Sequence, residues 1–228
     1  GKITNCQIGV FAAYVSRRGH AFIDRVLYLP KSWTDDPARL KAAHVPADIG
    51  FATKPQIAAK MIERAIAAGV PFSWVAADTV YGVGDIERDL RRAGKGYVLG
   101  VSSTHWFGSW SKKRPVAGTA AQIAEALKPA DWKRLSAGHG TKGPRLHDWA
   151  YLELADLKAG EFNDELHGMW TRGLLVRRHI TNGELAFFST WCPAGTLINR
   201  LVAVEGHRWS IEDSFETAKN ELGLDHNE

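Results

Sequence analysis

One strand, helix, strand order between residues 71 and 102 constrains the fold more than any other part of the chain. The apolar run PFSWVAAD (71–78) has the length of a strand and ends in an aspartate. The segment DIERDLRRAG (85–94) is typical of a helix, and the apolar run GYVLGVS (96–102) again has strand length. Strands joined through a helix lie parallel, because a tight turn joins only antiparallel strands. We therefore expect an α/β fold that contains a parallel pair of strands.

An antiparallel hairpin is predicted before this unit. The segment NCQIGVFAAYVS (5–16) is typical of a buried strand, and HAFIDRVLYLP (20–30) alternates well enough to be its partner. Residues 30–50 show no clear period, so we expect an irregular connection there. Residues 54–69 keep a helical period and end at a glycine. With the hairpin beside the parallel pair, the prediction is a mixed sheet flanked by helices.

The alternation of strands and helices stops after residue 102. Three later segments have strand character: RLHDWAYLEL, GLLVRRHI and LAFFSTW. We therefore predict a mostly β insertion over residues 103–195, between a first core segment (1–102) and a final helical segment (196–228). That final segment is expected to hold one or two helices, with a possible break at Gly206.

Composition narrows the class of protein only in part. The 228 residues carry a formal charge of +4, which favours a polyanionic partner such as nucleic acid about as well as it favours simple solubility. The two cysteines, Cys6 and Cys192, have no C-x-x-C companion, so neither a disulfide framework nor a zinc site is predicted. No apolar run approaches the roughly 18 residues that span a bilayer. Basic clusters recur at Arg17–Arg18, Arg91–Arg92, Lys112–Lys113–Arg114 and Arg177–Arg178.

The segment HRWSIEDSFETAKNELG (207–223) is predicted to form an amphipathic helix. Its apolar stripe consists of Ile211, Phe215, Ala218 and Leu222. Arg208, Glu212 and Lys219 lie at the edge of this stripe, within about 40° of one another on a helical wheel. A carboxylate at the margin of a core can face a cleft. The alternative is that Arg208 and Glu212 form an ordinary i, i+4 surface ion pair.

Asp78 stands where an apolar strand ends. The carboxyl ends of parallel strands are where α/β folds place their ligands, although an aspartate there also commonly caps the following turn. A strand-end aspartate together with a glutamate on a late helix matches the layout of ribonuclease-H-like nucleases. In those enzymes, carboxylates from strands and one helix converge on divalent metal ions.

These landmarks resemble the DDE transposases of insertion sequences, whose last catalytic carboxylate lies in a helix written Tyr-x2-Arg-x3-Glu-x6-Lys. Arg208, Glu212 and Lys219 fit that spacing, and RWSIE resembles the family's Arg-Trp-x-Ile-Glu core. The stretch VAADTVYG resembles the family's second-aspartate strand, and GKITNCQIGV resembles the strand that follows the first aspartate. The resemblance covers essentially the whole chain.

Two positions depart from the family pattern. Glu205 stands where the signature has tyrosine, which puts any phosphate contact of that tyrosine in doubt. The first aspartate of the family would lie on a strand before residue 1, and Asp24 is no substitute because it falls in the third strand by this alignment. We therefore expect a fragment that lacks the first catalytic aspartate and is inactive on its own.

The resemblance implies a ribonuclease-H-like fold in which Asp78 and Glu212 are catalytic and bind two magnesium or manganese ions. Two such ions about 4 Å apart can activate the attacking oxygen and neutralise the leaving one. Magnesium prefers hard oxygen ligands, which explains why carboxylates are expected here. Glu212 is preferred over Glu216 because it lies nearer the apolar stripe on the helical wheel.

The implied partner is double-stranded DNA, at the transposon ends and at the target. Arg208 and Lys219 are expected to contact its phosphates. Lys112, Lys113 and Arg114 are further candidates for DNA contact, with a solvated loop as the alternative. The resemblance also implies a homodimer in a synaptic complex, a cytoplasmic, nucleoid-associated location and no membrane.

The expected function is that of a transposase catalytic core, which performs metal-dependent DNA cleavage and strand transfer at the ends of a mobile element. Two alternatives stay open. One is a ribonuclease-H-like nuclease that repairs or resolves DNA. The other is a non-catalytic transposase remnant that still binds DNA, and the missing first aspartate keeps this alternative open.

Overall fold

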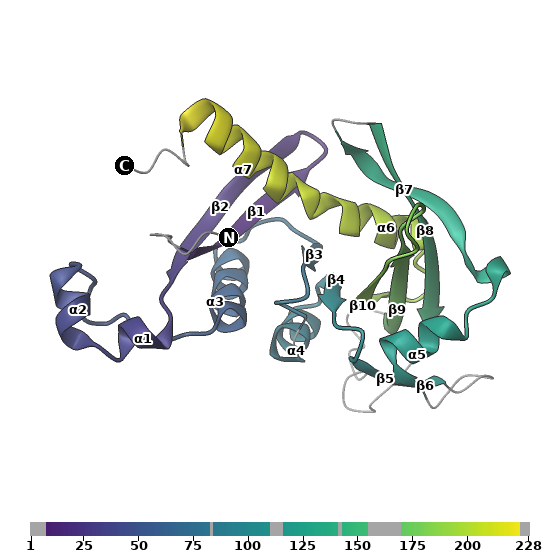
Figure 1. Cartoon of the computed structure of the whole chain (residues 1–228), viewed down its shortest axis with the longest axis horizontal. Helices are drawn as coiled ribbons and strands as arrows, with labels where there is room; N and C mark the ends of the chain where they lie inside the picture. The colour runs from purple at the N-terminus through teal and green to yellow at the C-terminus, as the bar shows by residue number, and fades with distance from the viewer. Residues whose placement is uncertain (1–7, 83, 110–115, 141–142, 155–169, 224–228) are drawn as a thin grey trace. The chain divides into compact units, whose positions relative to one another are not determined.

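A computed structural model describes residues 8–82, 84–109, 116–140, 143–154 and 170–223 (Figure 1). The chain divides into two compact units, residues 1–70 and residues 71–228, and each is described by itself. No helix in the described ranges is long and apolar enough to cross a membrane.

The first unit contains the predicted hairpin. Strands β1 (Ile8–Ser16) and β2 (Gly19–Tyr28) pair antiparallel, and the register shifts at Ala12/Ala13. In the described residues, these two strands form a sheet of their own, so the prediction that the hairpin extends the parallel pair is not met. Side-chain alternation identifies a strand but does not specify its neighbour, which explains the difference.

Helices follow the hairpin. The connection expected to be irregular contains α1 (Lys31–Thr34) and α2 (Pro37–Ala42), which are too short to show a helical period. The predicted longer helix is α3 (Lys54–Ala67), which begins with a capping box between Thr53 and Gln56. It packs against β1 and β2, and the Arg64 guanidinium contacts the Asp24 carboxylate at 2.7 Å.

The second unit begins with the predicted strand, helix, strand order. Strand β3 (Trp74–Ala77), helix α4 (Gly84–Arg92) and strand β4 (Gly96–Val101) follow one another, and β3 pairs parallel with β4. This confirms the parallel pair.

Four further strands extend this pair into one mixed sheet. They are β7 (Lys133–Gly140), β8 (Gly143–Glu153), β9 (Trp170–Arg178) and β10 (Leu185–Pro193). The strand order is β3-β4-β10-β9-β8-β7, and every pairing beyond β3–β4 is antiparallel. A mixed α/β fold is thus confirmed, and it is compatible with a ribonuclease-H-like architecture.

Smaller elements lie between β4 and β7. They are β5 (Trp106–Ser109), β6 (Val116–Thr119), α5 (Ala120–Glu125) and a 3-10 turn, Pro129–Asp131. The proposed boundaries at residues 102 and 195 stay a prediction. The strands of the expected insertion share a sheet with β3 and β4.

Both faces of the central strands of the six-stranded sheet are covered, because successive side chains point to opposite faces and both sets pack into a hydrophobic cluster. Leu175 and Phe188 contribute to the hydrophobic cluster that includes Leu201 of the final helical segment. Their neighbours Leu174 and Phe187 belong to a second cluster on the other side, which includes residues of β5 and α5. The double burial explains why these strands appear in the sequence as continuous apolar runs.

Two helices end the described chain: α6 (Ile198–His207) and α7 (Trp209–Leu222). The break between them is at Arg208 rather than at Gly206, which corrects the expectation from the sequence. Gly206 lies inside α6, and an added Cβ there would overlap the Ala137 carbonyl oxygen of β7. This glycine therefore permits close packing of a helix on a strand and does not end the helix.

The apolar stripe of α7 is covered less than its pattern predicts. No residue of this helix is buried, and Leu222 at its end is 79% exposed. Ile211, Phe215 and Ala218 are half-buried. The stripe therefore contributes little to the core of the second unit.

Candidate active site

Asp78 follows directly after β3, at the carboxyl end of the parallel pair, where the sequence places it. Its side chain is exposed, and its Oδ1 accepts a hydrogen bond from the Val80 amide at 2.9 Å. Its carbonyl oxygen accepts a second bond from the Tyr81 amide at 3.1 Å. These hydrogen bonds show that Asp78 caps the turn, which is the alternative that its sequence position also allows. A carboxylate has about four acceptor sites, however, so capping leaves capacity for a metal ion.

The backbone after Asp78 lies directly on β4. A Cβ added at Gly100 would come within 2.8 Å of the Thr79 amide nitrogen, and one added at Gly82 would overlap the Gly100 carbonyl oxygen. Burial and the charge of Asp78 together raise the pKa of Tyr81. Because Gly82 and Gly100 have no side chains, the Asp78 turn can lie close to the neighbouring strand.

Glu212 lies in the first turn of α7, and its side chain is 50% exposed. The Arg208 Nη1 atom donates a hydrogen bond to Glu212 Oε1 at 3.3 Å. The i, i+4 ion pair considered in the sequence is therefore present, and at this exposure such a pair contributes about 0.3–0.5 kcal/mol. So weak a pair leaves the Glu212 carboxylate available to a stronger ligand.

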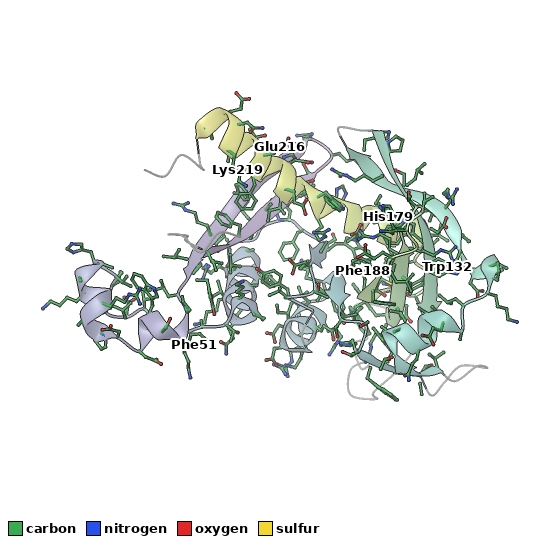
Figure 2. The ribbon with its side chains drawn as sticks, viewed as in Figure 1. Phe51, Trp132, His179, Phe188, Glu216 and Lys219 are labelled. Carbon is green, nitrogen blue, oxygen red and sulfur yellow. The ribbon has the colours of Figure 1, made fainter. Side chains whose placement is uncertain are left out.

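Among the described residues, the other predicted DNA-binding residue is Lys219 of α7. Lys219 and Glu216 are exposed farther along α7, as Figure 2 shows. Lys112, Lys113 and Arg114 lie outside the described residues. Of the predicted contacts, only Arg208 is shown beside a predicted catalytic residue.

The sequence did not predict that the carboxylate of Glu205 in α6 is buried. Glu205 is 1% exposed, and its Oε1 accepts a hydrogen bond from Arg177 Nη1 of β9 at 3.0 Å. Arg208 Nε lies 3.8 Å from the same oxygen. Burial raises the pKa of Glu205, and the charges of Arg177, Arg208 and Arg145 partly offset this effect. The sequence signal was a single glutamate among the apolar residues of α6.

Two arginines also lie against the ring of Trp209, the first residue of α7. The Arg145 and Arg208 guanidinium carbons are 5.0 and 4.8 Å from the ring centroid. Arg145 Nη2 lies 3.6 Å from Asp213 Oδ1. Positive and negative groups thus alternate around the start of this helix, and the sequence spacing gave no indication of the contribution from Arg145.

Comparison with models of protein families identifies the class to which the protein belongs. The model described as DDE superfamily endonuclease matches residues 1–146 of the 228. The chain belongs to the DDE superfamily endonucleases. No curated protein matches it. The match includes Asp78 and ends before Glu212, so it confirms the family resemblance without testing the signature around α7.

As a DDE endonuclease, the protein belongs to a class of nucleases and transposases that act on DNA and generally use divalent metal ions. The donor chemistry of Asp78 and Glu212 fits a magnesium ion, since both offer carboxylate oxygens. No group of three or more histidine, cysteine, aspartate or glutamate side chains suited to a metal occurs among the described residues.

Both candidate carboxylates of this DDE endonuclease lie in the second unit. Helix α6 packs against β3 and β4, and α7 follows α6 after a single residue. Asp78 and Glu212 are thus carried by elements that are connected through α6.

Proposed function

We propose that this DDE endonuclease is a transposase that cleaves DNA at the ends of a mobile element and joins those ends to a target. The observation that carries the proposal is Asp78, held at the carboxyl end of a parallel strand by the close backbone packing at Gly100. Family membership and the spacing of Arg208, Glu212 and Lys219, which begins at the residue before α7, support it.

In this proposal Asp78 and Glu212 bind two magnesium or manganese ions through their carboxylate oxygens. When bound, such ions activate a water or a 3′-hydroxyl and neutralise the leaving oxygen of the phosphodiester. Arg208 screens the charge of Glu212 while no cation is present. Arg208 and Lys219 then hold the phosphates of the bound strand by charge-assisted hydrogen bonds.

The proposal extends to how the protein holds its DNA. Residues 103–195 form a β-rich region that grips double-stranded DNA, and Lys112, Lys113 and Arg114 contact its phosphates there. Two copies of the protein bring two DNA ends together as a homodimer. Light scattering, with and without DNA that carries the transposon ends, measures how many copies of the protein are in the complex. A protein that stays monomeric when it is saturated with this DNA contradicts the homodimer.

Plasmid nicking tests the catalytic assignment without knowledge of the natural DNA ends. The protein, expressed from its whole reading frame, is incubated with supercoiled DNA and magnesium or manganese. We expect Asp78→Asn and Glu212→Gln each to reduce nicking by about 100-fold or more. Mutation of a residue that only hydrogen-bonds to a metal ligand already costs about 10–100-fold in metal affinity or activity, and loss of the ligand itself should cost at least as much.

Glu216→Gln is the matched control, because Glu216 is exposed one turn farther along the same helix. It should nick like the wild type. Equal nicking by Glu212→Gln and Glu216→Gln would remove Glu212 from the site. Circular dichroism of each variant separates loss of chemistry from loss of fold.

One observation favours a second candidate, a remnant that binds DNA without cutting it. The carboxylates of Asp78 and Glu212 already have protein partners in the described structure, the Val80 amide and Arg208. A remnant would bind DNA with a strong salt dependence and would show no nicking with either cation in the wild type. Metal-dependent nicking that Asp78→Asn abolishes would exclude this candidate.

A further inference from the structure

The Glu205 carboxylate has one well-satisfied oxygen and one without a partner. Oε1 accepts the hydrogen bond from Arg177 at 3.0 Å. Oε2 is buried and has no hydrogen-bond partner among the described residues. A buried carboxylate keeps its charge only where donors satisfy it, so a free oxygen in this position is unusual. It is an acceptor to which a nearby donor can move.

Arg208 is a second donor near the Glu205 carboxylate. Its Nε is 3.8 Å from Glu205 Oε1, beyond hydrogen-bond range, and its Nη1 is 3.3 Å from Glu212 Oε1, at the long end of that range. Neither contact is well formed. The planar guanidinium carries five donors and can bind a carboxylate through two parallel hydrogen bonds. Arg208 therefore lies between two carboxylates and is held weakly by both.

A cation at Glu212 changes this balance. A divalent ion takes the Glu212 oxygens and repels the positive guanidinium beside them. Arg208 must then lose its partner or find another carboxylate. Glu205 Oε1 keeps its hydrogen bond from Arg177, and Glu205 Oε2 accepts a new one from Arg208. The buried oxygen and the displaced guanidinium then each have a partner.

We propose that Glu205 is a positioning residue for the cation site, which takes up the Arg208 guanidinium when a divalent ion binds to Glu212. The Arg208 donors that Glu205 does not use stay available to a DNA phosphate. The inference rests on the proposed function, because it requires Glu212 to hold the ion. Glu205 is the residue at which this chain departs from the transposase signature, which has tyrosine at that position.

Manganese titration by calorimetry, on the protein without DNA, tests the proposal with four variants. Glu205→Gln keeps the shape of the side chain but leaves Glu212 as the better partner of Arg208, so we expect about tenfold weaker manganese binding. Glu212→Gln should abolish binding at this site. Arg208→Gln removes the competing charge and should bind at least as tightly as the wild type.

The Glu205→Gln/Arg208→Gln double variant separates a positioning role from a structural one. If Glu205 acts through Arg208, the double variant recovers wild-type manganese affinity, because the competitor is gone. A double variant as weak as Glu205→Gln would overturn the proposal. So would a folded Glu205→Gln protein with wild-type affinity while Glu212→Gln abolishes binding, and in that case the proposed function would stand.

Wild-type affinity in Glu212→Gln would remove both the proposed function and the inference. A measurement on the wild type covers the case in which Glu205→Gln does not fold. The Nε resonance of Arg208, assigned by its loss in Arg208→Gln, should shift on saturation with magnesium. A resonance that stays in place at saturation contradicts the proposal.

Discussion

The Arg177 guanidinium of β9 donates a hydrogen bond to the Glu205 carboxylate of α6 at 3.0 Å, and Glu205 is 1% exposed. This pair fastens α6 to the middle of the six-stranded sheet. Helix α6 leads into α7, where Glu212 lies, and it packs on β3, after which Asp78 follows. Helix α6 therefore links the elements that carry the two candidate catalytic carboxylates.

Arg177→Met tests the contribution of this buried pair. Removal of one partner leaves Glu205 without its main counter-charge, and such a loss typically costs about 3–5 kcal/mol in the free energy of unfolding. Urea denaturation measures it. Arg134→Met is the matched control, because Arg134 pairs with Asp148 from a side chain that is 57% exposed. Its cost should be about 1 kcal/mol or less. Equal costs for the two variants would contradict a structural role for the Arg177–Glu205 pair.

Gly206→Ala should destabilise the second unit, because the new methyl group would overlap the Ala137 carbonyl of β7. Overpacking of this kind costs about 1–3 kcal/mol, and a clash with backbone lies at the upper end. Gly84→Ala is the control, since a Cβ there meets nothing within 4 Å. Thermal unfolding should show a lower Tm for Gly206→Ala and little change for Gly84→Ala. A neutral Gly206→Ala would mean that α6 and β7 are not in close contact.

Gly100→Ala should reduce the nicking rate as well as the stability of the second unit. Its methyl group would push away the backbone of residues 78 and 79, which carries Asp78. A displacement of about 1 Å can cost about 100-fold in rate. Nicking rates and the free energy of unfolding are measured on the same preparations, with Gly50→Ala as a control in open space. An unchanged nicking rate in Gly100→Ala would argue against catalysis by Asp78.

The stability of the second unit should fall as the pH drops below about 6.5. Burial, followed by the charges of Arg177 and His179, lowers the pKa of His147 below its usual value of 6.5. As the pH falls through 6.5, the unfolded chain takes up a proton that the folded chain does not, so folding loses free energy down to the lowered pKa.

His147→Gln should weaken this dependence, while His139→Gln, at an exposed position of β7, serves as the control for the loss of an imidazole. Urea unfolding at pH 7.5, 6.5 and 5.5 gives the three slopes. A His147→Gln slope that equals the slope of the wild type would show that His147 does not link stability to pH.

Local patterns predicted the elements that carry the site, but not their partners. The apolar run ending at Asp78 specifies β3, because its length and its terminal residue are local features. The pairing of Phe188 in β10 with Gly100 in β4 joins residues far apart in the chain, and no side-chain period encodes such a neighbour. The six-stranded sheet was therefore not predictable in this form.

The candidate site was predictable to a similar degree. The spacing of Arg208 and Glu212 places them one turn apart on a helix, and the structure shows the resulting contact. The Arg177–Glu205 pair was not predictable, because it depends on how α6 lies across the sheet. Gly206 was misjudged for the same reason, since its role is set by the Ala137 carbonyl of another element.

Calorimetric titration of magnesium or manganese tests whether Asp78 and Glu212 bind metal ions, with wild type, Asp78→Asn, Glu212→Gln and the Glu216→Gln control measured side by side. We expect Asp78→Asn and Glu212→Gln to lose the binding that the wild type and Glu216→Gln retain. Binding that is unchanged in both Asp78→Asn and Glu212→Gln, or absent from the wild type, would contradict it. Arg208 and Glu212 would then be a surface ion pair.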